Sequence, residues 1–210
     1  MNKALAFFLT LFGISSVPIA LGFLLVTRGA APRPWVAPWR VAYCCFALGA
    51  LIALLAAGQE TIQLFYFPFA HALLLVGVGL NTLGWWRLWR GSSPLYLAVL
   101  PIGFYGVFYF TCGRFWEPTR LAALFSILFA LASAPAAVSA YWGLHSGHPH
   151  RRTAATLLLA LNVLFWAVRG FYLLGPFSHT DHLYAFATAG LELTLYLGLQ
   201  AFLQWSVLTE

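Results

Sequence analysis

Charged side chains are scarce in this sequence. Its 210 residues include 11 Lys and Arg and five Asp and Glu, so charged residues make up only 8% of the chain while hydrophobic residues make up 62%. A soluble domain carries about 25% charged residues. The composition therefore excludes a soluble globular domain, and the same excess of apolar residues excludes a disordered chain. It predicts a protein whose main solvent is lipid.

The sequence motifs of common enzyme classes are also missing. It contains no G-x-S-x-G, no P-loop and no G-x-G-x-x-G. Lys3 is the only lysine, which excludes a retinal Schiff base inside the membrane, and His71 is the only histidine clearly inside an apolar run, which leaves no histidine pair for a haem. No two acidic residues are close enough for a carboxylate dyad. We expect a non-enzymatic protein, and the sequence identifies no cofactor.

Long hydrophobic runs are abundant instead, and seven of them are long enough to cross a bilayer as helices. They are Ala4–Val26, Val41–Ala57, Phe65–Trp86, Leu95–Cys112, Leu121–Leu144, Thr153–Leu174 and Leu183–Val207. Only short loops and tails remain between them, without room for an extramembrane domain. The sequence thus predicts an all-α, polytopic integral membrane protein, a seven-transmembrane-helix bundle formed by residues 1–210 as a single domain.

The distribution of basic residues predicts the orientation of this bundle. The loops after the first, third and fifth runs contain seven arginines: Arg28, Arg33, Arg40, Arg87, Arg90, Arg151 and Arg152. The opposite side has only Lys3, Arg114 and Arg120. Cytoplasmic loops carry the excess of Lys and Arg, so we expect the N-terminus outside and the C-terminus inside a bacterial inner membrane. Because the arginines form no basic stripe and no binding motif, we expect no nucleic acid partner.

The same topology bears on the cysteines and histidines. Cys44 and Cys45 should lie at the inner end and Cys112 at the outer end, too far apart for a disulfide. The histidine-rich segments at 145–150 and 179–182 match no zinc signature, so we expect no metal site.

Small residues predict where the helices approach closely. One run carries Ala122, Ser126, Ala130 and Ala134 at i+4 spacing, and Gly49 and Gly77 offer similar contacts in two other runs. We expect these positions to lie at helix–helix contacts of one compact bundle.

Three ionisable residues lie inside the apolar runs, where each costs several kcal/mol unless it has a partner or a purpose. At 1.5 Å per residue, Arg169, His71 and Glu192 lie roughly 8, 9 and 14 Å below the outer edge, which is one layer within the error of the boundaries. Polar residues continue this layer along two helix faces. They are Tyr184, Thr188, Glu192, Tyr196 and Gln200 at i+4 spacing, and Asn162, Trp166 and Arg169.

Two interpretations of this layer remain open. In the first, His71, Arg169 and Glu192 form a polar cluster in an outward-opening cavity, a ligand or proton site to which Asn162, Thr188 and Tyr196 contribute. In the second, Arg169 snorkels outward and Glu192 is merely paired or protonated, tying helices together.

The layout also resembles a known family. The features that carry the resemblance are Leu80-Asn81-Thr82-Leu83-Gly84-Trp85-Trp86-Arg87 followed by Trp89-Arg90-Gly91, the Thr119-Arg120 entry to the fifth run, and Arg169 late in the sixth. The chain is similar to the seven-helix membrane sensor regions that precede diguanylate cyclase (GGDEF) or kinase output domains in bacterial signalling proteins. In that family the chain continues into an output domain, whereas this sequence ends at Glu210. We therefore expect either a sensor that acts on another protein or a shortened version of a longer one.

The resulting expectation is a sensor or receptor-like module that acts through a membrane or cytoplasmic partner protein and binds a small ligand from the outer side. An accessory or structural subunit of a larger membrane complex, respiratory or photosynthetic for example, is the first alternative; its aromatic-rich helices would pack against partner subunits, lipid or pigment. A small transporter is the second.

Overall fold

The computed structural model describes residues 3–29, 33–56, 60–92, 94–111, 118–143, 149–175 and 179–209. These ranges contain seven α-helices and no strand. The helices are α1 (Lys3–Thr27), α2 (Val36–Ala56), α3 (Glu60–Arg90), α4 (Tyr96–Thr111), α5 (Pro118–Tyr141), α6 (Pro149–Leu174) and α7 (His179–Leu208). Each predicted run coincides with one helix, so the all-α class and the number of helices are confirmed.

Four of the helices contain segments that are long and apolar enough to cross a membrane. These segments are Val36–Leu55, Pro68–Arg90, Thr119–Tyr141 and His150–Leu174. The apolar segments described in α1 and α4, Ile14–Thr27 and Val99–Thr111, are shorter. Because a helix satisfies its own backbone hydrogen bonds in hydrocarbon, these features indicate a membrane-embedded protein.

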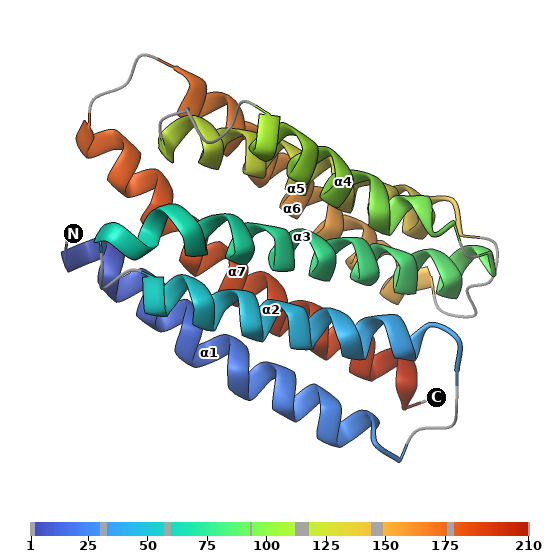
Figure 1. The fold of residues 1–210 in the computed structure, drawn as a ribbon. Coiled ribbons are helices and arrows are strands. Elements are labelled where there is room, and N and C mark those ends of the chain that lie inside the picture. The colour runs from blue at the N-terminus through green and yellow to red at the C-terminus, as the bar shows by residue number, and fades with distance from the viewer. Residues whose placement is uncertain are drawn as a thin grey trace.

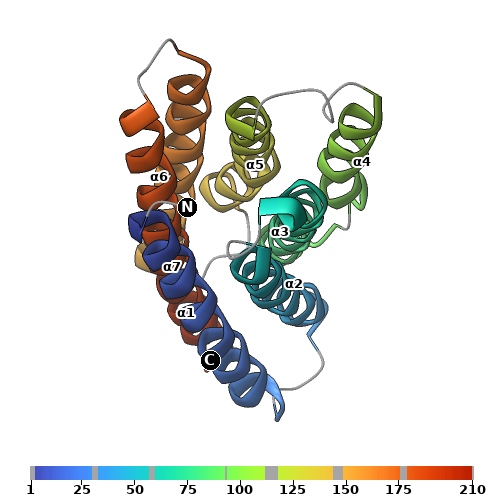
Figure 2. The same ribbon diagram turned by 60° about the vertical axis from the view of Figure 1, so that its left-hand side comes forward.

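Two tightly packed helix pairs form the centre of the molecule. The helices α2 and α3 pack along each other, as do α5 and α6, and contacts between α3 and α5 join the two pairs. On one side lies α7, which packs mainly against α1 and touches α6 more lightly, while α4 lies at the periphery beside α3 and α5 (Figures 1 and 2). The two ends of the chain lie at opposite ends of the bundle (Figure 1).

Glycines allow the close approach within both pairs. A Cβ atom on Gly77 of α3 would lie 3.2 Å from the carbonyl oxygen of Ala42 in α2, and one on Gly49 would lie 3.2 Å from that of Ala70. In the other pair, a Cβ on Gly170 would lie 3.2 Å from the carbonyl oxygen of Ala123. The predicted close contacts at Gly49 and Gly77 are confirmed.

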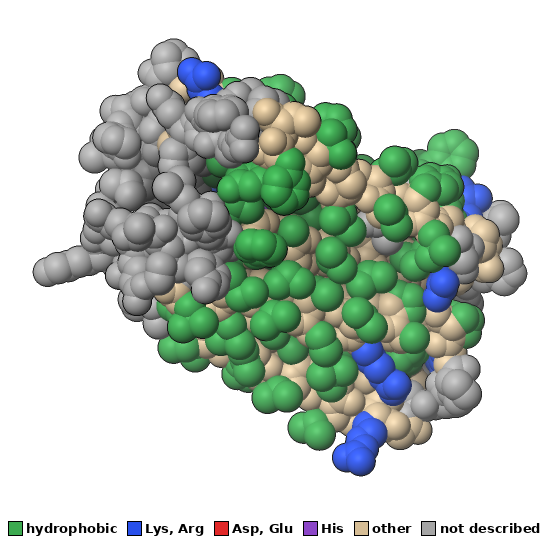
Figure 3. Space-filling view, in the orientation of Figure 1, with side chains coloured by type: hydrophobic (Ala, Val, Ile, Leu, Met, Phe, Trp, Pro, Cys, Tyr) green, Lys and Arg blue, Asp and Glu red, His purple; other side chains and the backbone are tan. Residues whose placement is uncertain are grey.

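Arginines gather at one end of the bundle, where they donate hydrogen bonds to carbonyl oxygens near helix ends. The pairs are Arg33 with Val207 (3.4 Å), Arg40 with Thr27, Arg87 with Pro34 (3.0 Å), Arg151 with Ser206 (2.6 Å) and Arg152 with Gly143 (3.1 Å). Four of these carbonyls lie in or just after the last turn of a helix, where they lack partners within the helix and carry partial negative charge, so cations stabilise them. The fifth, that of Pro34, lies just before α2. Figure 3 shows basic side chains at this end of a largely apolar face, with a further basic side chain near the opposite end. The arginines expected on one side of the membrane therefore do share one end of the molecule.

Some predicted helix boundaries were wrong. The second helix begins at Val36 rather than Val41, and α3 runs from Glu60 to Arg90 rather than from Phe65 to Trp86. Pro38 is compatible with the early start because the first turn of a helix needs no N–H donor there.

Candidate functional site

A cavity of about 420 Å³ lies between α6 and α7. Its walls are formed by Leu158, Leu161, Asn162, Phe165, Leu191, Glu192, Leu195, Tyr196 and Leu199. Small-molecule sites typically measure about 300–1,000 Å³, with mostly apolar walls and a few polar groups, and this cavity has both properties.

The opening of the cavity lies at the side of the bundle. The leucines at its rim, Leu161 on α6 and Leu191, Leu195 and Leu199 on α7, have exposed fractions between 43% and 62%. Apolar side chains exposed along two neighbouring helices form a surface suited to lipid. The cavity therefore opens sideways between α6 and α7, rather than toward an end of the bundle as the sequence interpretation assumed.

Three of the residues singled out from the sequence, Asn162, Glu192 and Tyr196, line this cavity. Asn162 is only 2% exposed, yet neither its Nδ2 nor its Oδ1 atom has a hydrogen-bond partner among the described residues. The same holds for Glu192 Oε2. A buried polar group without a partner costs about 1–3 kcal/mol. Each of these atoms has less than 1 Å² of exposed surface, so a ligand in the cavity would bond to them only after the side chains turn toward it.

The polar rows of α6 and α7 both point into the bundle. Asn162, Trp166 and Arg169 are all buried on α6. On α7, Tyr196 is 4% exposed and Gln200 only 1%, and neither polar atom of Gln200 has a partner among the described residues. The side chain of Thr188 lies outside the described part of the chain. The helical spacing alone thus identified the inward faces correctly.

Arg169 lies at the centre of the polar layer. Its Nη1 atom donates a hydrogen bond to the Ser126 hydroxyl of α5, and its guanidinium lies 5.2 Å from the ring centroid of Trp166. It interacts electrostatically with Glu192 on α7 and with His71 on α3. With 7% of its surface exposed, Arg169 does not snorkel outward, so that part of the second interpretation was wrong. Arg169 of α6 is instead hydrogen-bonded to α5 and interacts electrostatically with titratable groups of α7 and α3.

Glu192 lies beside Arg169 and beside the indole of Trp166. Neither the indole nitrogen nor Glu192 Oε2 has a described partner within hydrogen-bond geometry, so the contact with Trp166 is one of proximity. Glu192 and Arg169 interact electrostatically in a part of the molecule where an isolated charge would be costly.

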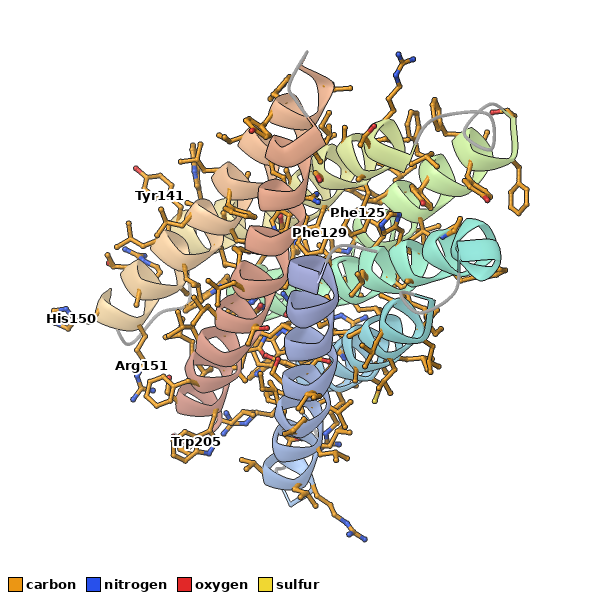
Figure 4. The ribbon with its side chains drawn as sticks, turned by 90° about the vertical axis from the view of Figure 1, so that its left-hand side faces the viewer. Phe125, Phe129, Tyr141, His150, Arg151 and Trp205 are labelled. Carbon is orange, nitrogen blue, oxygen red and sulfur yellow. The ribbon has the colours of Figure 1, made fainter. Side chains whose placement is uncertain are left out.

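His71 lies at the far side of this layer and does not line the cavity. Its Nδ1 atom is 2.9 Å from the hydroxyl of Tyr105 on α4, and its ring stacks on Phe125 of α5 with centroids 4.3 Å apart. Phe125 and Phe129 both lie inside the bundle (Figure 4), and each also contacts the Trp166 ring. The predicted cluster therefore divides into a cavity wall (Asn162, Glu192, Tyr196) and a supporting layer behind it (Arg169, His71).

Several partners of the site were missed from the sequence. Gln204 Nε2 donates to Asn81 Oδ1 across 2.8 Å, and the hydroxyls of Ser15 and Thr194 lie 3.1 Å apart. Gln204 could have been found, because it continues the i+4 row of Glu192, Tyr196 and Gln200 by one more turn. The first bond attaches α7 to α3 beyond the C-terminal end of the cavity, and the second attaches α7 to α1 at the level of the cavity.

In the part of the chain that the structure describes, no three His, Cys, Asp or Glu side chains gather where they could hold a metal ion. Cys44 and Cys45 are free thiols, and Cys112 lies outside the described residues. His150 is described, and it is exposed at the start of α6 (Figure 4).

Comparison with known proteins gives no assignment: no family model matches the sequence, and no curated protein or solved structure matches it significantly.

Proposed function

We propose that this protein is a non-enzymatic sensor of the bacterial inner membrane that crosses the bilayer seven times, with its N-terminus outside, and acts through a partner protein. The arginine-rich end, formed where α1, α3, α5 and α7 end, would then face the cytoplasm, in agreement with the positive-inside rule. The N-terminal end of the bundle would face outward.

The observation that carries this proposal is the set of buried polar atoms without partners on one wall of the α6–α7 cavity. Elsewhere on α7, Gln204 Nε2 bonds to Asn81 Oδ1 at 2.8 Å, although Gln204 Oε1 has no partner among the described residues. Neither polar atom of the Asn162 side chain has a partner among the described residues, and Asn162 lines a space large enough for a small molecule. Polar groups inside a membrane that lack internal partners favour a functional site.

The packing of α7 suggests how binding would be communicated. This helix touches α6 lightly, so the cavity can change its width without disturbing the tight α5–α6 and α2–α3 pairs. Its C-terminal end is fixed by Arg151 and Arg33 and carries the 43% exposed Trp205 (Figure 4). A ligand that moved α7 at Glu192 would therefore alter the surface around Trp205, where a cytoplasmic partner could read the change.

Site-specific cross-linking tests this proposal. Trp205 is replaced by a photoreactive phenylalanine analogue in the full chain, and the adducts formed in living cells are compared with and without Glu192→Gln. We expect a discrete adduct with one protein whose yield changes in the Glu192→Gln background. The matched control replaces Leu164, which is 58% exposed on α6 and does not line the cavity; it should give no such adduct.

The same experiment distinguishes the alternatives. A stoichiometric adduct that does not respond to Glu192→Gln would contradict a sensor and favour an accessory subunit of a larger complex. No discrete adduct at position 205 would contradict action through a partner at this end, and accumulation of a small solute dependent on Asn162 would then favour a transporter.

A further inference from the structure

We propose that the α6–α7 cavity binds an uncharged, membrane-borne amphiphile that enters sideways from the lipid, with its polar head on Asn162 and Glu192 and its hydrocarbon tail between the rim leucines. This inference rests on the proposed function, because it names the ligand class of the same site.

The route of entry follows from the position of the opening. The rim residues are leucines on both helices, with 62% of Leu161 and 58% of Leu195 exposed. A water-soluble ligand would have to cross this apolar rim, whereas a lipid-like molecule already lies against it. Burying the tail of the amphiphile against these leucines contributes roughly 0.8 kcal/mol per CH₂ to the binding free energy when the tail comes from water. A tail that comes from the bilayer is already in hydrocarbon and gains little. The selectivity for one amphiphile over bulk lipid must therefore come from the polar wall.

That wall requires a head group that both donates and accepts hydrogen bonds. Within the described part of the chain, Asn162 Nδ2 has no acceptor and Asn162 Oδ1 has no donor. Tyr196 and Glu192, whose Oε2 also has no partner among the described residues, lie on the facing helix. Amides and hydroxy-carbonyl compounds offer both kinds of group within a few atoms, whereas a pure hydrocarbon or an ether offers no donor.

The charges behind the wall favour a neutral head. Glu192 and Arg169 interact electrostatically behind the wall, and a charged head group would disturb this interaction. A cationic head would add an uncompensated positive charge to this apolar region, and an anionic head would lie next to the carboxyl of Glu192. Either change is expensive away from water, so an uncharged head is the chemistry that fits.

Photoaffinity labelling of the purified full chain in lipid nanodiscs tests the inference. Four probes share one alkyl tail with a photoreactive group and an affinity handle, and they differ only in the head: a primary amide, a methyl ether, a carboxylate or a trimethylammonium. We expect the amide probe to label peptides of α6 and α7 around the cavity, at concentrations where the other three label weakly. Asn162→Leu should weaken this labelling about tenfold, equivalent to a hydrogen bond worth about 1.4 kcal/mol.

Two further variants keep the test interpretable if Asn162→Leu does not fold. Leu195→Trp narrows the cavity from its exposed rim without touching the buried polar atoms, and it should also abolish specific labelling. Phe171→Leu changes a 69% exposed side chain of α6 that does not line the cavity, and it should leave labelling unchanged.

Each outcome separates this inference from the proposed function. Equal labelling by the methyl ether probe, or labelling that is insensitive to Leu195→Trp, would overturn the amphiphile site even if the Trp205 adduct still responds to Glu192→Gln. Stronger labelling by the cationic or the anionic probe would overturn the neutral head. Specific amide labelling combined with no adduct at position 205 would support the site while contradicting the sensor.

Discussion

Gln204 of α7 donates a hydrogen bond from Nε2 to Asn81 Oδ1 of α3 across 2.8 Å, and both side chains are almost completely buried. This bond lies in the interior of the bundle, a little more than one helical turn from the cavity toward the arginine-rich end. It links α7 to the central α2–α3 pair, as does the longer bond from the Tyr43 hydroxyl of α2 to the Leu197 carbonyl oxygen at 3.5 Å. The position of α7 relative to the core therefore depends in part on these two amides.

A double-mutant cycle measures this link. We expect Asn81→Leu and Gln204→Leu each to destabilise the protein, because each leaves the other amide buried without its partner. The double variant should lose less than the sum of the two single variants, with a coupling of about 0.6 kcal/mol, the average for hydrogen bonds between membrane helices, and at most about 1.7 kcal/mol. Unfolding by SDS in mixed micelles, followed by circular dichroism, gives the free energies. Strictly additive effects would show that the bond does not hold α7.

A second prediction concerns the charge balance of the polar layer. Arg169→Met removes the cation that lies beside Glu192 and should lower the free energy of unfolding by about 3–5 kcal/mol, the usual result of breaking a buried ion pair. Ser126 retains a bond to the Ala122 carbonyl oxygen at 2.6 Å, so the uncompensated carboxylate should account for most of the loss. Adding Glu192→Gln to Arg169→Met should then restore part of the stability.

The same unfolding measurement checks this rescue. If Arg169→Met and the double variant with Glu192→Gln unfold at the same SDS fraction, Glu192 and Arg169 do not compensate each other, and the case for a neutral ligand head loses its basis.

A third prediction tests the close packing of α5 and α6. In Gly170→Ala the new Cβ would lie 2.6 Å from Ile127 Cγ1 and 3.3 Å from the Ile127 backbone nitrogen. Because backbone atoms of α5 would have to move, we expect a destabilisation of about 1–3 kcal/mol. The matched control is Gly198→Ala on α7, whose Cβ would meet nothing within 4 Å; it should stabilise the helix by roughly 0.5–1 kcal/mol. A larger loss in Gly198→Ala than in Gly170→Ala would contradict this packing.

The seven helices could be predicted from the sequence because long apolar runs in a chain with few charges have only one way to satisfy their backbone groups in lipid. The ends of the helices were harder to predict. Trp89 was assigned to a loop, yet α3 continues through it, because its ring stacks with Trp85 at 6.3 Å and Trp85 packs edge-on against Trp39 at 5.1 Å. Tryptophan is typical both of membrane interfaces and of buried contacts, so composition could not separate the two.

The inward faces of α6 and α7 were also predictable, because polar residues at i+4 spacing on an apolar helix have one favourable direction. The partners across helices were not. Ser126 was interpreted as a small packing residue, but it accepts the hydrogen bond of Arg169, and Tyr105 is the unforeseen partner of His71. Which residue of a neighbouring helix lies opposite depends on rotation and offset, which a pattern on a single helix does not contain.

The last prediction concerns the C-terminal end of α7, where Arg151 Nη1 donates to the Ser206 carbonyl oxygen at 2.6 Å and Arg33 Nη1 reaches that of Val207 at 3.4 Å. Both carbonyls belong to the last turn of the helix, where cations stabilise the unsatisfied acceptors. Arg151→Ala should raise amide hydrogen exchange over residues 203–208 about tenfold, the equivalent of one charge-assisted bond of about 1.5 kcal/mol. Arg33→Ala should have a smaller effect, because its bond lies at the limit of hydrogen-bond length. The control is His150→Ala, which changes the exposed neighbour of Arg151 (Figure 4). If His150→Ala raises hydrogen exchange as much as Arg151→Ala does, Arg151 does not anchor the end of α7. The proposed route from the cavity to Trp205 would then need another support.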